Sequence, residues 1–219
     1  MITLYGHAMS RAHRNLWMLR ELGVAFDHEP TDFLRGGNKT PEFLRLNPNG
    51  KVPALADDGL VLFESLAINL YLARKFGGEM APRDDGENAL TLQWTLWVAN
   101  EIEKTLFVAC ENLFFFAPAD RRRDEAELAL VKLARPFAVL DAYLRDRPHL
   151  LGARFTVADL NVAAVMTLIP IAGVDIGAWP HMSLWLARCL DRPAADDYKR
   201  IAFSVPRPAT EAAWMQSLM

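Results

Sequence analysis

The chain has 219 residues, of which 52% are hydrophobic and 23% charged, and its formal net charge is -3 at pH 7. A chain of this length and apolar content can bury one large core or two modest ones. Its slightly acidic balance argues against nucleic acid as a partner, because phosphate contacts need clustered lysine and arginine.

The sequence also argues against membranes, disulfides and metals. The N-terminal segment lacks the continuous apolar core of a signal peptide. The most apolar stretch, residues 157–174, carries Asp159 and is broken by Pro170, which excludes a membrane span. Cys110 and Cys189 suit a reducing compartment, and the five histidines show no metal-ligand spacing on one element. We expect a cytoplasmic protein with no metal and no membrane partner.

In chain order, the first predicted elements are a short strand and a helix. Ile2–Tyr5 is a strand-like run, and Arg11–Leu22 carries its apolar residues on one face. Ser10 stands at their junction, where a serine usually caps the helix N-terminus. No cysteine occurs at this junction, so thiol–disulfide exchange by a thiol of the protein itself is not expected.

A tight turn and a hairpin follow. Gly50 permits the turn, and Pro53 pushes the residue before it into an extended conformation, with its backbone available to a ligand. A peptide could lie there as an added strand. In Pro53–Phe63, two apolar runs meet at Asp58-Gly59, a dipeptide that tolerates the positive φ angles of a type I′ turn, which predicts a hairpin.

The second strand of this hairpin ends at Glu64-Ser65, where a helix is predicted to begin. Apolar residues between 66 and 74 recur at helical spacing, so Ser65 lies at a helix N-terminus, where unpaired N–H groups and the helix dipole attract an anion. Glu64 offers the opposite charge, and the pair could hold the carboxylate and ammonium groups of an amino-acid headgroup. The structural alternative is a serine that only caps its helix.

After Gly77 the sequence changes character. Turn formers interrupt the apolar pattern over residues 77–86, strands and helices alternate before them, and only helical patterns follow. We therefore expect a domain at 1–78, a linker at 79–87 and an all-helical domain at 88–219. The predicted helices cover Asn88–Phe116, Asp120–Arg145, Thr156–Ile171, Met182–Leu190 and Ala194–Ala202.

Two local signals refine the helical part. Pro136 falls inside the second predicted helix and should kink or break it. Thr156 and Asp159 have the spacing of a capping box, and Phe155 with Leu160 can form a hydrophobic staple around the same turn.

Taken in order, these segments resemble the glutathione S-transferase family over nearly the whole chain. The opening strand and helix are similar to a thioredoxin-like βα start, and residues 37–44 look like the loop that supplies a cation to the glycine carboxylate of glutathione. Residues 151–160 are similar to the helix-start motif of the family's second domain. The resemblance implies an α/β thioredoxin-like N-terminal domain followed by an all-α C-terminal helical domain.

The resemblance also implies a binding site for glutathione as the co-substrate. The family presents the backbone before the proline of this site through a cis peptide bond, so Val52–Pro53 is expected to be cis. The implied glutathione-binding residues are Asn38, Lys39, Lys51, Val52, Pro53, Glu64 and Ser65.

The catalytic residue is expected where the first strand meets the helix. Ala8-Met9-Ser10 is similar to the opening of plant-type serine transferases, which makes Ser10, assisted by Arg11, the predicted catalytic group. Several classes of the family use a tyrosine near the end of the first strand, so Tyr5 is the alternative. Lowering the pKa of the glutathione thiol from about 8.5 to about 6.5 needs about 2.7 kcal/mol, and one charge-assisted hydrogen bond supplies about 1.5–3 kcal/mol.

The implied function is a glutathione transferase that activates the thiol of bound glutathione for attack on a small electrophile. The electrophile would rest on an apolar wall of the second domain, with Trp97, Phe107 and Leu113–Phe116 as candidates, and His7 could also contribute.

Two other functions and one assembly question stay open at this point. A protein of the same fold could bind glutathione or another ligand without catalysis. A glutathione-dependent isomerase is the other alternative, although Met9-Ser10 lacks the paired serine and cysteine expected of it. The resemblance implies a homodimer, but Asn49 stands where many dimeric classes place an aromatic key residue.

Overall fold

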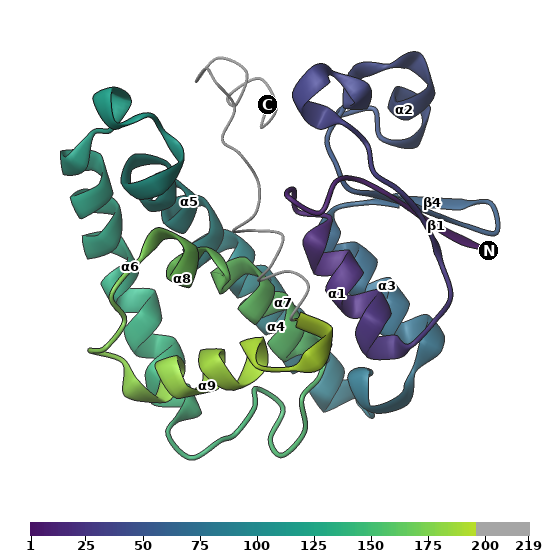
Figure 1. Cartoon of the computed structure of the whole chain (residues 1–219). Helices are drawn as coiled ribbons and strands as arrows, with labels where there is room; N and C mark the ends of the chain where they lie inside the picture. The colour runs from purple at the N-terminus through teal and green to yellow at the C-terminus, as the bar shows by residue number, and fades with distance from the viewer. Residues whose placement is uncertain (196–219) are drawn as a thin grey trace. The chain divides into compact units, whose positions relative to one another are not determined.

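The computed structural model describes residues 1–195, which fall into two compact units, the first ending at Gly78 and the second beginning at Glu79. The first unit mixes strands and helices, and the second is built of helices (Figure 1). The predicted combination of an α/β and an all-α part is confirmed. The predicted helix Ala194–Ala202 lies almost entirely outside the described residues.

A four-stranded sheet forms the middle of the first unit. Its order is β2-β1-β3-β4; β1 is parallel to β2 and antiparallel to β3, and β3 is antiparallel to β4. The elements are β1 (Ile2–Tyr5), α1 (His13–Leu22), β2 (Asp27–Glu29), η1 (Phe33–Arg35), η2 (Gly37–Lys39), α2 (Pro41–Leu46), β3 (Ala54–Asp57), β4 (Leu60–Phe63) and α3 (Ser65–Phe76). Helices α1 and α3 lie side by side on one face of the sheet, and α2 lies on the other (Figure 1).

The hairpin between β3 and β4 has the predicted turn. Asp57 pairs with Leu60, and the two residues between them both have positive φ angles, 48° at Asp58 and 91° at Gly59. This is the combination that a type I′ turn requires, and it matches the twist of the two strands. The turn prediction is therefore confirmed.

The start of α1 differs from the prediction. The helix begins at His13, with Ala12 as its N-cap, rather than at Arg11. Ser10 lies in turns that precede the helix, and its Oγ accepts a hydrogen bond from the Ala12 N–H at 3.2 Å. A serine hydroxyl that bonds the backbone two residues ahead competes with helix formation, which explains the later start.

The far end of α3 is tied to the hairpin by polar contacts. The Tyr71 hydroxyl donates to Asp57 Oδ2 at 2.8 Å, and the Lys75 ammonium group contacts the same carboxylate. The hydrogen bond from Lys75 holds the pKa of Asp57 below its usual value. These contacts attach α3 to the end of β3.

The second unit is built around one buried helix, α7. Its elements are α4 (Asp85–Trp97), η4 (Val98–Glu103), α5 (Lys104–Cys110), η5 (Glu111–Phe115), η6 (Pro118–Asp120), α6 (Arg123–Leu144), α7 (Val157–Met166), α8 (Leu168–Ala172) and α9 (Pro180–Leu190), after a short turn η3 (Gly78–Met80). The π-helical turns η4 and η5 continue α4 and α5. All ten residues of α7 are buried, and α4 and α9 pack against it. No helix among the described residues is long and apolar enough to cross a membrane.

Helix α6 is uninterrupted at Pro136, so the expected break does not occur. Proline cannot donate the N–H that would bond the carbonyl oxygen of Lys132. Pro136 is nevertheless buried together with Leu133, Phe137 and Leu140. Packing of this apolar face outweighs the loss of one backbone hydrogen bond, as tertiary contacts commonly override local preference.

The capping box at the start of α7 is present as predicted. Thr156 and Asp159 exchange side-chain and backbone hydrogen bonds across the first turn. The other carboxylate oxygen of Asp159 accepts from the Leu150 N–H at 2.8 Å and from Trp185 Nε1 at 3.0 Å. This buried carboxylate therefore fixes a helix start, the preceding loop and α9 at once.

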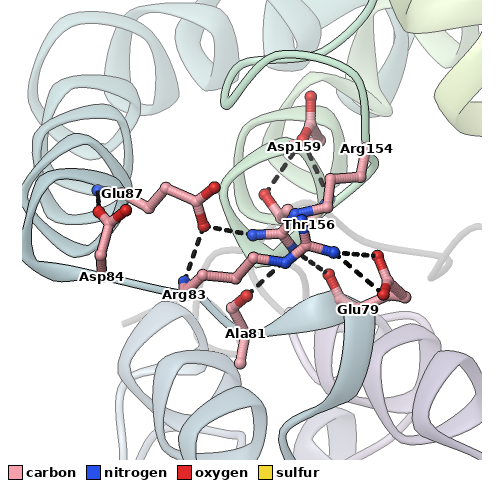
Figure 2. A network of polar contacts seen from close by, with 8 residues as sticks. All are labelled: Glu79, Ala81, Arg83, Asp84, Glu87, Arg154, Thr156 and Asp159. Atoms are coloured by element: carbon pink, nitrogen blue, oxygen red, sulfur yellow. Dashed lines mark hydrogen bonds and ion pairs between the residues drawn. The ribbon is translucent and has the colours of Figure 1, made fainter.

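A second network joins the first residues of this unit to the loop before α7 (Figure 2). Arg154 donates to the carbonyl oxygens of Glu79 at 2.6 Å and Ala81 at 3.1 Å, and it pairs with the Glu87 carboxylate. The Glu87 N–H donates to the carboxylate of Asp84, the N-cap of α4, at 2.8 Å. The helix therefore starts within the segment that the sequence suggested as a linker.

Removal of the α7 cap should destabilise the protein. Thr156→Ala is expected to lower the free energy of unfolding by about 1 kcal/mol through loss of the cap. Asp159→Ala should cost more, roughly 3 kcal/mol, because it leaves buried donors of Leu150 and Trp185 unpaired. Urea denaturation followed by circular dichroism measures both effects. The exposed Asp146→Ala is the control, and equal stability of the Asp146 and Asp159 variants would contradict the prediction.

Candidate functional site

The sheet register brings most of the predicted site segments to one edge of the first unit. Ala54 pairs with Tyr5 on one side and with Phe63 on the other. The segments that follow Tyr5, precede Ala54 and follow Phe63 therefore start at the same end of three neighbouring strands. These segments carry Ser10, Arg11, Lys51, Val52, Pro53, Glu64 and Ser65.

Gly6 allows two of these segments to approach closely. Its φ is +143°, and a Cβ at this position would lie 2.7 Å from the Cβ of Ala12 and 3.3 Å from that of Val52. Only glycine fits such a contact without displacing its neighbours. The turns that contain Ser10 therefore lie beside the Val52–Pro53 segment.

The Ser10 hydroxyl is already hydrogen-bonded. It donates to the carbonyl oxygen of His7 at 2.7 Å, and it accepts from the Ala12 N–H at 3.2 Å. The Ser10 carbonyl oxygen lies 2.8 Å from Nδ1 of His13, which is buried. For its proton to reach a sulfur atom, the hydroxyl must leave the His7 carbonyl. Arg11, the predicted assistant, is exposed.

Tyr5 lies at the end of β1, paired with Ala54 and with Glu29 of β2, and it is partly exposed. It stands one residue before Gly6, at the same edge of the sheet as Ser10. Tyr5 and Ser10 therefore both lie at the sheet edge where the thiol is expected, and both residues are candidates for its stabilisation.

Two lysines lie on neighbouring segments, Lys39 at the end of η2 and Lys51 directly after the Gly50 turn, and hydrogen bonds from Asn38 and Asn47 hold this turn. Gly50 has a φ of +59°, and a Cβ there would lie 3.2 Å from Lys39 Nζ. The buried Asn38 amide donates to the Gly50 carbonyl at 2.7 Å, and Asn47 donates to the Lys51 carbonyl at 2.6 Å. Lys39 and Lys51 are both exposed. The amide donor of Asn38 thus positions the turn.

The peptide bond between Val52 and Pro53 is cis, as predicted. Val52 precedes the first residue of β3, Ala54, so it takes no part in the sheet ladder. Its backbone lies at the open end of the strand, where an extended peptide can be added.

The start of α3 has an unusual backbone conformation. Glu64 is the N-cap of the helix, and its φ of 72° and ψ of 106° lie in a region that non-glycine residues rarely adopt. Glu64 is exposed, whereas Ser65, the first helical residue, is buried. Ser65 Oγ accepts a hydrogen bond from Arg14 Nη1 at 3.2 Å. Residues held in such conformations cluster at ligand sites, which marks this helix start as a candidate.

Sequence reasoning missed the polar residues of α1 and α3 that stand behind Ser65. Asn15 donates to the Ser65 carbonyl at 2.8 Å and to Asn69 Oδ1 at 2.7 Å, and Arg14, Asn15 and Asn69 are all buried. Their position among the apolar residues of predicted helices could have identified them, because a polar side chain that is buried there needs hydrogen-bond partners.

The aromatic residues expected to form an apolar wall divide into two groups within the second unit. Phe115 stacks near Phe107, with ring centroids 6.0 Å apart, and near Phe114 at 5.5 Å. Trp97 instead packs edge-on against Trp94 at 5.0 Å. Phe107, Phe114 and Phe115 are partly exposed and cluster together, so they form the stronger candidate wall, whereas Phe116 is buried.

The thiols and the one group of potential metal ligands found among the described residues are structural in character. Burial raises the pKa of the Cys110 thiol to about 12, so it stays protonated at neutral pH. His149, Asp159 and Cys189 offer ligand atoms within 4.8 Å of one another. The Asp159 carboxylate, however, already accepts hydrogen bonds on both oxygens. We interpret this cluster as part of the capping centre of α7.

Two family models match the chain. The model of the glutathione S-transferase N-terminal domain matches residues 1–74, and that of the C-terminal domain matches residues 103–193. The chain belongs to the glutathione S-transferase family. The resemblance noted from the motifs is thereby confirmed, and the first unit contains the family's N-terminal domain.

Individual transferases and a related oxidoreductase match most of the chain. Disulfide-bond oxidoreductase YfcG of Escherichia coli (strain K12) is 33% identical over 202 residues, which cover 89% of this chain and 92% of that protein. The theta class glutathione S-transferase of Xanthomonas axonopodis pv. citri, solved with glutathione bound, is 31% identical with a TM-score of 0.84, over 93% of this chain and 98% of that one. Glutathione S-transferase I from maize, solved with an atrazine glutathione conjugate, is 29% identical with a TM-score of 0.84. The match covers 94% of this chain and 99% of that one.

Charge removal at either end of the candidate glutathione site should weaken binding. Lys39→Ala and Glu64→Gln are each expected to raise the Kd for glutathione roughly tenfold, because a hydrogen bond to a charged group is lost. Isothermal titration calorimetry measures the effect. Lys132→Ala, which removes an exposed lysine of α6, is the control. Wild-type affinity in both site variants, with the fold intact, would show that the site is misassigned.

Proposed function

We propose that this member of the glutathione S-transferase family binds glutathione extended along the edge of its first unit and activates the thiol for attack on a small electrophile. One observation carries the proposal: the register of β1, β3 and β4 gathers the Val52 backbone, which lies outside the strand ladder, the Ser10 turns and the Glu64-Ser65 helix start at one sheet edge.

Each part of glutathione has a chemically matched group in this arrangement. The exposed ammonium groups of Lys39 and Lys51 suit the glycine carboxylate, and the backbone of Val52 suits the cysteinyl amide. Glu64 suits the γ-glutamyl ammonium group, and the N-terminus of α3 at Ser65 suits its carboxylate. Asn38 supports the lysines through its bond to Gly50.

Ser10 would stabilise the thiolate only in part. A charge-assisted bond to sulfur contributes about 1.5–3 kcal/mol, but the hydroxyl gives up its bond to the His7 carbonyl, worth about 1 kcal/mol. The remainder is smaller than the roughly 2.7 kcal/mol that a two-unit change in the thiol pKa requires. The positive potential of the turns before α1 and the guanidinium group of Arg11 would supply the rest.

The electrophile would be held by the aromatic surface of the second unit. Phe107, Phe114 and Phe115 present ring faces and edges suited to a planar, apolar molecule. The maize structure, with its atrazine conjugate, supports a substrate of this kind. Turnover of 1-chloro-2,4-dinitrobenzene with consumption of glutathione tests the transferase activity directly, and binding of glutathione without turnover of any electrophile would favour the non-catalytic alternative.

The similarity to the oxidoreductase YfcG favours one second candidate function, glutathione-dependent reduction of disulfides. In that reaction the thiolate of bound glutathione attacks a disulfide sulfur, forms a mixed disulfide and releases the other sulfur as a thiolate. A second glutathione thiolate then attacks the glutathione sulfur of the mixed disulfide, which releases the remaining substrate thiolate and forms glutathione disulfide. The reaction needs no cysteine of the protein, which agrees with the buried, protonated Cys110. Parallel assays with 2-hydroxyethyl disulfide and with the chloronitroaromatic compound distinguish the two activities.

We further propose that the protein is a cytoplasmic homodimer. Strand β4 is an edge of the sheet, and its Leu60, Val61 and Phe63 are 42%, 39% and 38% exposed. An apolar edge strand is a liability unless another surface covers it. Light scattering should give twice the mass of one chain, and Val61→Lys should yield monomers while Leu184→Lys on α9 does not. A monomeric wild-type protein would contradict this proposal.

Substitution of Ser10 should change the ionisation of bound glutathione. Ser10→Ala is expected to raise the thiol pKa in the complex by about 1 unit and to lower turnover at pH 7, with little change in glutathione affinity. Thiolate absorbance against pH, measured for wild type, Ser10→Ala and Tyr5→Phe, checks this. A shift seen only in Tyr5→Phe would assign the role to the tyrosine.

A further inference from the structure

The Ser65 hydroxyl has a defined donor–acceptor arrangement. Its oxygen accepts a hydrogen bond from Arg14 Nη1 at 3.2 Å, and among the described residues it donates none. A hydroxyl has one proton to give, and a donor that occupies its oxygen directs that proton elsewhere. The arrangement leaves the Ser65 proton for an acceptor outside the described residues.

Arg14 also places a buried charge at the start of α3. Its side chain is only 3% exposed, and the contact joins the first turn of α1 to the first residue of α3. A cation near a helix N-terminus adds to the positive potential of the dipole, which is unfavourable for the helix alone and favourable for a bound anion. The same bond polarises the hydroxyl and makes it a stronger donor.

We propose that Arg14 is a positioning residue for substrate recognition: it orients and polarises the Ser65 hydroxyl toward the α-carboxylate of the γ-glutamyl group. The inference rests on the proposed glutathione site. Arg14 acts through Ser65, without touching the substrate. It should therefore set the selectivity for that one carboxylate and leave the ionisation of the thiol unaltered.

A glutathione analogue that lacks this carboxylate provides the test. The probe is γ-aminobutyryl-cysteinylglycine, and the measured quantity is the ratio of its Kd to that of glutathione, obtained by calorimetry on the full chain. In Arg14→Met this ratio should fall about fivefold, because the hydroxyl loses the donor that orients it. Ser65→Ala should lower the ratio at least as much, and the double variant no further than Ser65→Ala.

The controls separate this role from a general structural one. Arg74→Met removes the same charge from the exposed far end of α3 and should leave the ratio unchanged. If Arg14→Met weakens both ligands equally, the residue is only structural and the inference is overturned. If the Arg14 variant does not fold, Arg14→Lys, which keeps the charge and loses the planar fork, should still lower the ratio, and an unchanged ratio there would equally overturn the inference.

A wrong assignment of the glutathione site itself would give a different pattern of Kd ratios. An unchanged ratio in Ser65→Ala would mean that Ser65 does not bind the carboxylate, which overturns the proposed glutathione orientation together with the role of Arg14. A reduced ratio in Ser65→Ala with an unchanged ratio in Arg14→Met would overturn the role of Arg14 alone.

Discussion

The start of α3 is fixed by a buried, hydrogen-bonded joint with α1. The Asn15 amide donates to the Ser65 carbonyl and to the Asn69 side chain, and Asn69 donates to the Arg14 carbonyl at 3.3 Å. A donor left unpaired at this depth would cost about 1–3 kcal/mol, so neither helix can slide along the other without a large penalty. The joint sets the position of the N-terminal end of α3 relative to the turns that carry Ser10. The rest of the proposed glutathione site depends on that placement.

The strain at Glu64 follows from the same geometry. Strand β4 ends at Phe63 and α3 begins at Ser65, so a single residue must turn the chain from strand to helix. Glycine would adopt the required positive φ at little cost. A glutamate in this conformation costs about 1–3 kcal/mol of backbone strain, which the hydrogen bonds between α1 and α3 must offset. The chain thereby gains a carboxylate directly beside a helix N-terminus, where an ammonium and a carboxylate group can be bound together.

Local signals in the sequence identified one hairpin turn and one helix cap. The Asp58-Gly59 turn and the Thr156–Asp159 cap each form within four residues, and both are present as predicted. The start of α1 was misplaced because the Ser10 hydroxyl bonds the backbone two residues ahead. The break considered at Pro136 does not occur, because burial of its helix face outweighs a missing backbone hydrogen bond.

The support of the candidate site could not be predicted from the sequence, because its partners are far apart in the chain. Arg14 and Ser65 are separated by 51 residues, and Asn38 and Gly50 by 12. Periodicity identifies a polar residue on a helix but does not say which distant group it will meet. The pairs become visible only after the sheet register has fixed where the segments start.

The two units use buried polar groups for opposite purposes, and hydrogen-bonding capacity distinguishes them. In the second unit the Asp159 carboxylate accepts bonds on both oxygens from the capping turn, Leu150 and Trp185, which leaves little capacity for a ligand. In the first unit the Ser65 hydroxyl accepts a hydrogen bond from Arg14. Among the described residues it donates none, so its proton is available to another acceptor. A polar group whose hydrogen-bonding capacity is fully used within the protein stabilises the fold. A group that is held in place but still has a proton to donate is available to bind a ligand. The proposed recognition chemistry therefore lies at the start of α3, whereas the start of α7 belongs to the architecture that supports the helical unit.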